Sequence, residues 1–223
     1  MVTTLYLIRH GETEGSEIKR YKGSIDVPMS EKGIEQIKGT SVFIQNMIQD
    51  SGYMIQDKKN HESCIVHNAS SKLSAVYCSP LSRALKSAEI IAEPHGLKPV
   101  VIEDLRERSF GIWEGMTFTE IKEKYPQEFE AWAGNPLRYS PVDGESTVEV
   151  RERAVKAVDS LLSNHNSEHI AIVAHGGVNR IILCHIMGIP LENIFRIEQD
   201  FAAVNIIEFW EKYPVVKLLN GGI

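Results

Sequence analysis

The sequence predicts an α/β fold in which helices flank a mostly parallel central sheet in three layers. Apolar strands alternate along the chain with amphipathic helices, an order typical of parallel pairing. Two stretches typical of buried strands, at residues 5–8 and 169–174, are each followed closely by a His-Gly pair, which places His10 and His175 at strand ends. Parallel strands end at one edge of the sheet, where open α/β folds bind their ligands.

The first half of the chain alternates strands with helices. Gly11 lets the backbone turn sharply after the first strand, and the loop that follows ends before Ser30, a favourable N-cap residue. A second helix follows a Ser-Pro turn and ends at Pro94 and Gly96. We expect a strand at 5–8, a loop at 11–29, a helix at 31–48, a strand at 75–78, a helix at 83–93 and a strand at 99–102.

The second half begins with an irregular, charged segment and then returns to helices and strands. Pro126 divides two short helices, and Ser146 is placed to cap a long helix whose apolar residues recur at helical spacing. His169 flanks the next strand and is expected at the surface. We expect irregular structure at 103–115 and 134–146, helices at 117–125, 127–133, 147–162 and 178–187, and strands at 169–174, 203–209 and 215–219.

Length and composition are those of an ordinary globular protein. The chain has 223 residues, of which 43% are hydrophobic and 24% charged, and we expect one domain over residues 1–223. Residues 50–72 are polar and lack a period, which indicates an insertion in that domain. Its histidines, His61 and His67, are expected to be solvated rather than metal ligands. The net charge of −6, without any basic run, argues against nucleic acid as a partner.

Targeting signals are not evident in the sequence. No apolar run is long enough to span a membrane, and no charged segment with an apolar stretch precedes the first strand. We therefore expect neither a membrane partner nor a signal peptide. The odd number of cysteines (Cys64, Cys78 and Cys184) fits reduced thiols in the cytoplasm, which is the expected location.

Cationic and nucleophilic side chains gather at the predicted sheet edge. Arg9 precedes His10, so a guanidinium and an imidazole share one rigid support. Arg83 opens a helix just after another strand, where backbone N–H groups and the helix dipole already favour an anion. A single Arg-His-Gly tripeptide could simply end a strand at the surface, but a second His-Gly strand end at His175 makes that interpretation require a coincidence. Together these residues predict a pocket for one phosphate.

Five short segments carry a resemblance to a known family. Residues 7–13 (LIRHGET) resemble the signature of the histidine phosphatase superfamily, also called the phosphoglycerate mutase-like family. The other motifs of that family are similar, in the same order, to residues 79–84 (SPLSRA), 105–115 (LRERSFGIWEG), 143–146 (DGES) and 173–177 (VAHGG). The resemblance implies the three-layer phosphoglycerate mutase-like fold.

The resemblance also implies a role for each matched residue. His10 is the nucleophile, phosphorylated on one ring nitrogen. Because the neutral ring is the nucleophilic form, its other nitrogen is expected to donate a hydrogen bond, with a backbone carbonyl as one candidate acceptor. Glu107 protonates the leaving alcohol and later takes a proton from water; it is chosen over the neighbouring carboxylates because it stands third in the Leu-Arg-Glu motif. The groups expected to hold the phosphoryl oxygens are Arg9, Thr13, Arg83 and a protonated His175.

The expected function is a phosphatase that acts on a small phosphorylated metabolite. No motif has metal-ligand spacing and the arginines can supply positive charge, so we expect neither a metal ion nor another cofactor. Residues 20–30 resemble a loop of α-ribazole phosphatases, which makes α-ribazole 5′-phosphate a candidate substrate.

Two alternatives remain at this point. A cofactor-dependent phosphoglycerate mutase generally has additional sequence after the third motif, whereas residues 116–121 here lead directly into a short helix. A non-catalytic phosphate-binding module would need neither His10 nor Glu107. The sequence does not determine which residues form the pocket wall. Residues 14–16 (EGS) stand where many members carry a Trp-Asn pair, and Phe110 and Trp113 could line either the pocket or the core.

Overall fold

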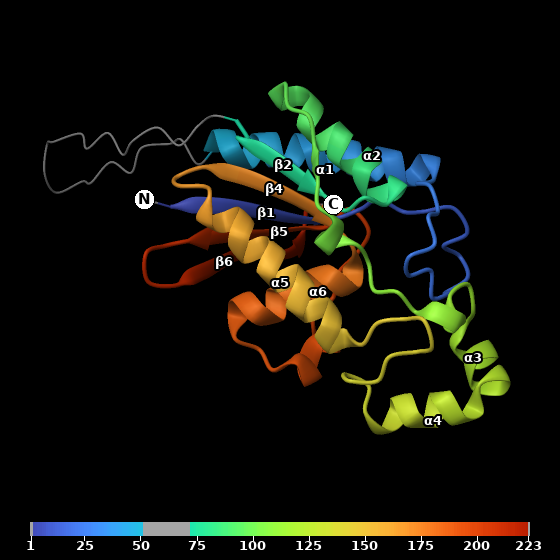
Figure 1. Ribbon diagram of the computed structural model, residues 1–223. Coiled ribbons are helices and arrows are strands. Elements are labelled where there is room, and N and C mark those ends of the chain that lie inside the picture. Colours follow the sequence, from blue (N-terminus) through green and yellow to red (C-terminus); the bar gives the residue numbers. More distant parts are fainter. Residues whose placement is uncertain (1, 51–71, 223) are drawn as a thin grey trace, which may run out of the picture.

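A six-stranded sheet forms the centre of the protein (Figure 1). The computed structural model describes residues 2–50 and 72–222. The strand order is β3-β2-β4-β1-β5-β6; the first four are parallel, and β5 is antiparallel to both of its neighbours. The strands are β1 (Thr3–Arg9), β2 (Ala75–Cys78), β3 (Val100–Val101), β4 (His169–Ala174), β5 (Val204–Phe209) and β6 (Pro214–Gly221). The expected α/β class with a mostly parallel sheet is confirmed.

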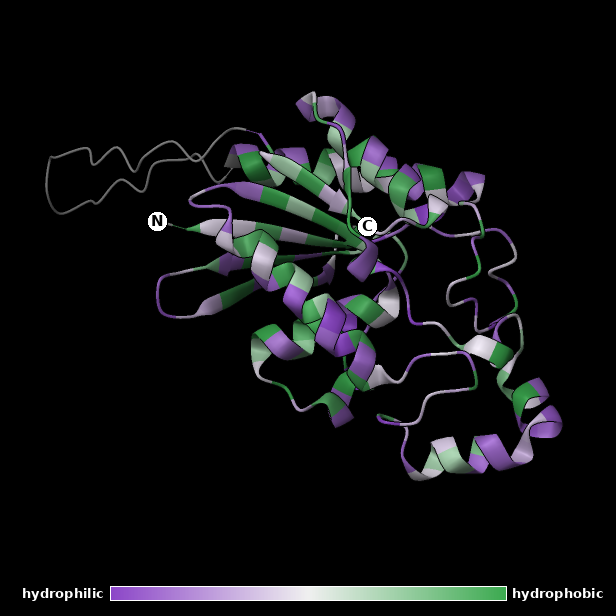
Figure 2. Ribbon diagram, viewed as in Figure 1, coloured by the Kyte–Doolittle hydropathy of each residue, from purple (hydrophilic) through white to green (hydrophobic). Residues whose placement is uncertain are grey.

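Helices cover both faces of this sheet and complete three layers. The side chains of β1 alternate between two cores, with Tyr6 and Ile8 in one and Leu5 and Leu7 in the other. All four are buried, and each aliphatic side chain contributes roughly 1.5–3 kcal/mol by leaving water. The apolar stripes of the helices turn toward the largely apolar strands (Figure 2). One face carries α1 (Glu31–Asp50) and α2 (Ser82–Ala92), and the other carries α5 (Thr147–Ser163) and α6 (Gly176–Met187).

A pair of short helices stands away from the sheet, α3 (Phe118–Lys124) and α4 (Pro126–Gly134) (Figure 1). Thr117 caps α3 through a reciprocal capping box with Glu120, and Pro126 begins α4. No residue of α4 is buried. The remaining helical turns are 3-10 segments at Glu93–His95, Glu103–Leu105, Gly111–Trp113 and Leu191–Arg196.

The caps expected at Ser30 and Ser146 are confirmed. Ser30 Oγ accepts the backbone N–H of Gly33 at 3.1 Å. Ser146 Oγ accepts the N–H of Glu149 at 3.2 Å, while the Glu149 carboxylate accepts the N–H of Ser146 at 2.6 Å. Such caps typically contribute about 1 kcal/mol each, so both long helices begin at residues fixed by local chemistry.

Three expectations are corrected by the structure. The strand expected at 99–102 is only the two residues of β3, both of them exposed. Helix α6 begins at Gly176 rather than 178, because His175 already has the extended backbone of a cap residue. His169, expected at the surface, is buried at the start of β4, with Nδ1 3.4 Å from the Tyr6 hydroxyl oxygen.

The insertion expected at 50–72 lies almost entirely outside the described residues, as do His61, Cys64 and His67. Cys78 and Cys184, which are described, are buried free thiols. Within 2–50 and 72–222, none of the helices has the length and apolar character that crossing a membrane requires.

Candidate active site

Three adjacent parallel strands, β2, β4 and β1, end at one edge of the sheet, and a polar residue follows each. Ser79 follows β2, His175 follows β4 and His10 follows β1. The strand ladder continues one residue past each of two strand ends: His10 N–H donates to Ala174 O and Ser79 N–H to Val173 O, both at 3.1 Å. The sheet itself therefore fixes where these side chains begin.

The ring of His10 is held in one orientation at this edge. Nδ1 lies 2.7 Å from the carbonyl oxygen of Gly11 and donates to it, which leaves the proton off Nε2. In the described part of the chain no group bonds to Nε2. Burial lowers the pKa of His10 well below its usual value, and the charges of Arg9 and Arg83 lower it further. His10 is thus a neutral imidazole with a free nitrogen lone pair.

Gly11 is required for this arrangement. A Cβ at that position would lie 2.3 Å from the carbonyl oxygen of Gly33, so only glycine lets the loop pass this close to α1. The carbonyl that accepts from His10 is therefore placed by a close approach of two backbone segments.

His175 faces His10 across the site. The two rings meet at an angle of 63° with their centroids 5.1 Å apart. Nε2 of His175 lies 2.7 Å from Ser79 Oγ, and that oxygen also accepts the N–H of Leu81 at 3.3 Å. With the Ser79 hydroxyl donating to Nε2, we assign the ring proton to Nδ1, which is buried and has no partner among the described residues.

The protonated His175 expected from the sequence is a prediction for the site with phosphate bound. Burial lowers the pKa of His175 well below its usual value, and His10 and the arginines add to that effect. The imidazole is therefore neutral here and can act as a hydrogen-bond donor through Nδ1. A bound dianion would favour its protonated form.

Arg9 lies beside the two histidines, and contacts with Gln199 and Phe201 hold its guanidinium in place. Its Nη1 donates to the carbonyl of Gln199 at 2.5 Å, and its guanidinium lies 3.9 Å over the ring of Phe201. Burial lowers the pKa of Arg9 to about 10, although Glu107 opposes the shift, so the group stays charged at neutral pH. Its Nε is buried and unpartnered among the described residues, like Nδ1 of His175. Buried donors are normally paired, so two orphans at one place indicate a site for an oxyanion.

Arg83 adds a second buried guanidinium from the first turn of α2. Its Nη1 and Nη2 donate to the carbonyls of Ile25 and Gly23, both at 2.8 Å. Arg83 is only 3% exposed, and its two hydrogen bonds hold the loop at 11–29 against the start of α2. Arg9, His10, Arg83 and His175 are called the strand-end cluster from here on.

Glu107 borders this cluster, and both of its carboxylate oxygens are placed by backbone groups. Oε1 accepts the N–H of Arg108 at 3.0 Å, and Oε2 accepts the N–H of Gly177 in the first turn of α6 at 3.1 Å. A Cβ on Gly177 would lie 2.7 Å from Oε1, which explains the glycine. The carboxylate also interacts electrostatically with Arg9 and Arg83.

Thr13, expected to hold phosphate, is buried and accepts a hydrogen bond from a lysine. Lys22 Nζ donates to Thr13 Oγ1 at 2.7 Å and to the carbonyl of Glu14 at 2.6 Å. The charge of Lys22 also lowers the pKa of His10, so this ammonium lies close enough to contribute to the field of the site. Sequence reasoning missed Lys22. No local pattern marks Lys22, because its position depends on the loop that Arg83 holds through the carbonyls of Gly23 and Ile25.

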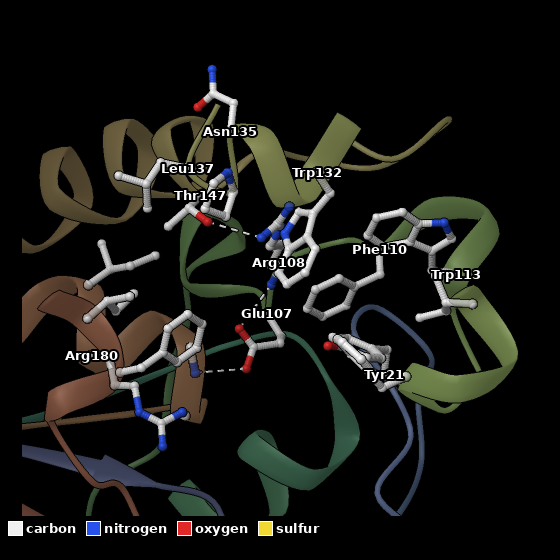
Figure 3. A pocket seen from close by; sticks show the side chains of 18 of the residues that line it. Tyr21, Glu107, Arg108, Phe110, Trp113, Trp132, Asn135, Leu137, Thr147 and Arg180 are labelled. Carbon is white, nitrogen blue, oxygen red and sulfur yellow. Dashed lines mark hydrogen bonds between the residues drawn. The ribbon is translucent and has the colours of Figure 1, made fainter. Parts of the chain in front are cut away.

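A cavity of about 600 Å³, shown in Figure 3, is lined by Arg9 of the cluster and by residues of α3 and α4. Glu107 and Gly177 also line it, so the cavity reaches the site of the proposed acid. Five aromatic side chains of the lining are called the aromatic wall from here on: Phe110, Trp113, Phe118, Phe129 and Trp132. Phe110 and Trp113, which the sequence left between pocket and core, both line the cavity, and Trp113 is also 97% buried, being 3% exposed.

No three His, Cys, Asp or Glu side chains of the described residues lie together where they could hold a metal ion. The positive charge at the strand ends comes from guanidinium and ammonium groups instead. These groups bind phosphate oxygens without any metal ligand.

Comparisons with known proteins agree with this geometry. The family model of the histidine phosphatase superfamily (branch 1) matches residues 5–53 and 60–221. Phosphoserine phosphatase 1 of Hydrogenobacter thermophilus is 27% identical over 216 residues, covering 97% of this chain and 91% of that protein. Adenosylcobalamin/alpha-ribazole phosphatase of Escherichia coli is 26% identical over 216 residues, covering 97% and 95%. The solved structure of Bacillus stearothermophilus YhfR is similar with a TM-score of 0.77 and 30% identity, covering 99% of this chain and 98% of that one.

Proposed function

Because this chain belongs to the histidine phosphatase superfamily, branch 1, we propose that it hydrolyses small phosphomonoesters without a metal ion, through a phosphohistidine on His10. One observation carries the proposal: Nδ1 of His10 donates to Gly11 O, so a neutral Nε2 stays free among fixed cations. Phosphoryl transfer requires in-line placement and charge stabilisation above all, and the fixed guanidinium groups beside His10 support a role of the strand-end cluster in the second.

The first step forms a P–N bond and breaks a P–O bond. Nε2 of His10 attacks phosphorus while the guanidinium groups of Arg9 and Arg83 and Nδ1–H of His175 bind the phosphoryl oxygens. Glu107, which enters this step as the acid, gives its proton to the departing alkoxide. The alcohol leaves and the phosphoryl group stays on His10.

The second step consumes water and restores the enzyme. Glu107, now a carboxylate, takes a proton from the water that attacks phosphorus. The P–N bond breaks, inorganic phosphate forms and Nε2 of His10 regains its lone pair. Glu107 is protonated again, so the cycle closes without any other reactant.

The relatives share a phosphatase reaction but are named for different substrates. Two relatives named as phosphoserine phosphatases, one of them putative, are 27% and 31% identical to this chain, and the adenosylcobalamin/alpha-ribazole phosphatase of Escherichia coli is 26% identical. The loop at 20–30 favours α-ribazole 5′-phosphate as one candidate. A mutase would need to exclude water from the phosphohistidine, and a binding module would have no use for a free Nε2, so each alternative makes a different measurable claim.

Rapid-quench experiments test the proposal. Turnover of para-nitrophenyl phosphate should give an acid-labile, base-stable phosphoryl group that peptide mapping locates on His10, with one inorganic phosphate released per turnover. Activity should persist in EDTA. A phosphoryl group on another residue type, or an activity that EDTA abolishes and magnesium restores, would contradict the proposal. Interconversion of phosphoglycerates without release of phosphate would make the protein a mutase.

A further inference from the structure

The cavity beside the strand-end cluster is much larger than a phosphate needs, and aromatic rings make up a large share of its lining. Its volume of about 600 Å³ is within the usual range of sites that enclose a whole small molecule. Phe118, Phe129 and Trp132 contact one another with ring centroids 5.0, 6.3 and 5.6 Å apart, and Trp113 joins them at 6.4 Å from Trp132. We propose that this aromatic wall binds a flat apolar group on the leaving alcohol, so that preferred substrates are phosphomonoesters of alcohols carrying an aromatic ring system.

This inference rests on the proposed phosphatase function, because it assigns the cavity to the alcohol side of the P–O bond. Glu107, the proposed acid, lines the same cavity as the aromatic wall (Figure 3). An alcohol that receives its proton from Glu107 therefore leaves from the end of the cavity that opens toward the rings.

The cations along the cavity beyond Arg9 do not favour a carboxylate on the substrate. All three guanidinium nitrogens of Arg108 already donate to protein oxygens, at 2.6 Å to Glu145 O, 3.0 Å to Thr147 Oγ1 and 3.2 Å to Tyr139 O. Arg180 donates to the carbonyl of Ile197 at 2.7 Å and is paired with Glu198. Glu192 adds a negative charge to the lining. Among the described residues, the cavity thus offers apolar surface rather than an uncommitted charge for a substrate such as phosphoserine.

Large apolar side chains at the rim also remain open to solvent. Phe118 is 49% exposed, and Phe195, which also lines the cavity, is 79% exposed. Exposed aromatic surface is unfavourable in water, and a ring bound between these walls would cover part of it. Both the lining and the rim therefore favour the same class of ligand.

A matched pair of alkyl phosphates tests the inference without changing the leaving-group chemistry. Both 2-(1-naphthyl)ethyl phosphate and ethyl phosphate leave as primary alkoxides, so a difference between them reports on binding of the ring. We expect kcat/KM to be about 100-fold higher for the naphthyl compound, since burial of a bicyclic ring is strongly favourable. Phosphoserine should resemble ethyl phosphate. Higher kcat/KM for phosphoserine than for the naphthyl compound would overturn the inference while leaving the phosphatase function intact.

Variants assign the preference to the wall. Trp132→Ala should reduce the naphthyl-to-ethyl ratio of kcat/KM about tenfold, and Phe195→Ser, a change at an exposed side chain, should reduce it a few-fold without a risk to folding. The matched control is Trp210→Ala, at a half-exposed tryptophan after β5 that lies outside the cavity lining. An unchanged ratio in both cavity variants would overturn the inference.

A binding measurement keeps this test independent of turnover. Titration calorimetry should give tighter binding of 2-(1-naphthyl)ethylphosphonate than of ethylphosphonate, neither of which can be hydrolysed. Equal affinities would overturn the aromatic subsite. Absence of phosphohistidine with every phosphate ester, together with a clear naphthyl preference in calorimetry, would overturn the proposed function and leave the subsite standing.

Discussion

The strand-end cluster and the aromatic wall border one cavity but are built in opposite ways. The cluster stands on the ends of paired strands and the first turn of a helix, and His10, Arg83 and His175 are no more than 6% exposed. The wall is carried largely by α3 and α4, and α4 has no buried residue at all. The part proposed for bond breaking is thus held by the sheet, whereas the part proposed for substrate choice stands on a peripheral helix pair.

This difference indicates which of the two regions tolerates changes of its side chains. A displacement of the cluster would disturb the sheet, because its backbone hydrogen bonds continue the strand ladders. The wall can change its side chains with little effect on either core. Chemistry supported by rigid elements, with specificity in adjustable connections, is a common division in enzymes.

The largest expected effect comes from removing the nucleophilic nitrogen alone. In His10→Asn the side-chain amide can still donate to Gly11 O, as Nδ1 does now, but nothing replaces Nε2. We expect kcat to fall by roughly 10,000-fold or more, as for the loss of other enzymatic nucleophiles. Single-turnover quench should detect no phosphoenzyme, while circular dichroism shows a folded protein. A variant with more than a tenth of wild-type kcat would remove His10 from the nucleophile role.

The next effect separates the cluster from its neighbouring acid. Glu107→Gln should slow transfer from ethyl phosphate to His10 by roughly 100- to 10,000-fold, since an alkoxide leaves poorly without a proton. Transfer from para-nitrophenyl phosphate should change far less, because nitrophenolate needs little help. Pre-steady-state kinetics isolates this step from water attack.

The control for this comparison is Glu103→Gln, four residues earlier, where the carboxylate is exposed and paired with Arg106. It should leave both rates within twofold of wild type. Equal losses with the two substrates in Glu107→Gln would show that Glu107 supports the site in some way other than proton donation.

The strand-end cluster could be predicted from sequence because each member stands in a short contiguous pattern. An apolar run that stops at Arg9-His10, or at His175, marks a strand end without any knowledge of distant residues. Parallel pairing then brings these ends to one edge. The capping residues Ser30 and Ser146 were predictable for the same reason, since a cap depends only on the next three residues.

The wall and Lys22 could not be predicted in this way. Phe118, Phe129 and Trp132 look like ordinary apolar residues of short helices, and only the placement of α3 and α4 turns them toward Glu107. Lys22 lies in a loop that Arg83 holds by donating to the carbonyls of Ile25 and Gly23. These two residues precede Arg83 by 58 and 60 positions, so the contact depends on the tertiary fold. His169 was wrongly expected outside because its burial depends on neighbouring strands.

A smaller effect tests whether Lys22 belongs to the strand-end cluster functionally. Lys22→Gln keeps a donor for Thr13 Oγ1 but removes the charge near His10. If Lys22 contributes to phosphate binding, the inhibition constant of vanadate and the KM should both rise about tenfold, in the range expected for one charge-assisted hydrogen bond. The control is Lys38→Gln, whose exposed ammonium pairs with Glu35 on α1. Unchanged vanadate inhibition would limit Lys22 to anchoring the loop.

The smallest expected effect is on the pH dependence of the free energy of unfolding, to which His10 of the cluster contributes and the aromatic wall does not. The pKa of His10 lies well below its usual value in the folded protein, so near pH 6 the unfolded chain binds a proton that the folded one does not. The free energy of unfolding should therefore fall as the pH drops below about 6.5, by up to about 1.4 kcal/mol per pH unit for this residue. In His10→Asn, the slope of the free energy of unfolding against pH, measured by urea unfolding between pH 6.5 and 5, should be smaller than in the wild type by up to about 1.4 kcal/mol per pH unit. Trp132→Ala should keep the wild-type slope. A parallel slope in His10→Asn would mean that His10 is protonated in the folded protein, and the neutral nucleophile would have to be abandoned.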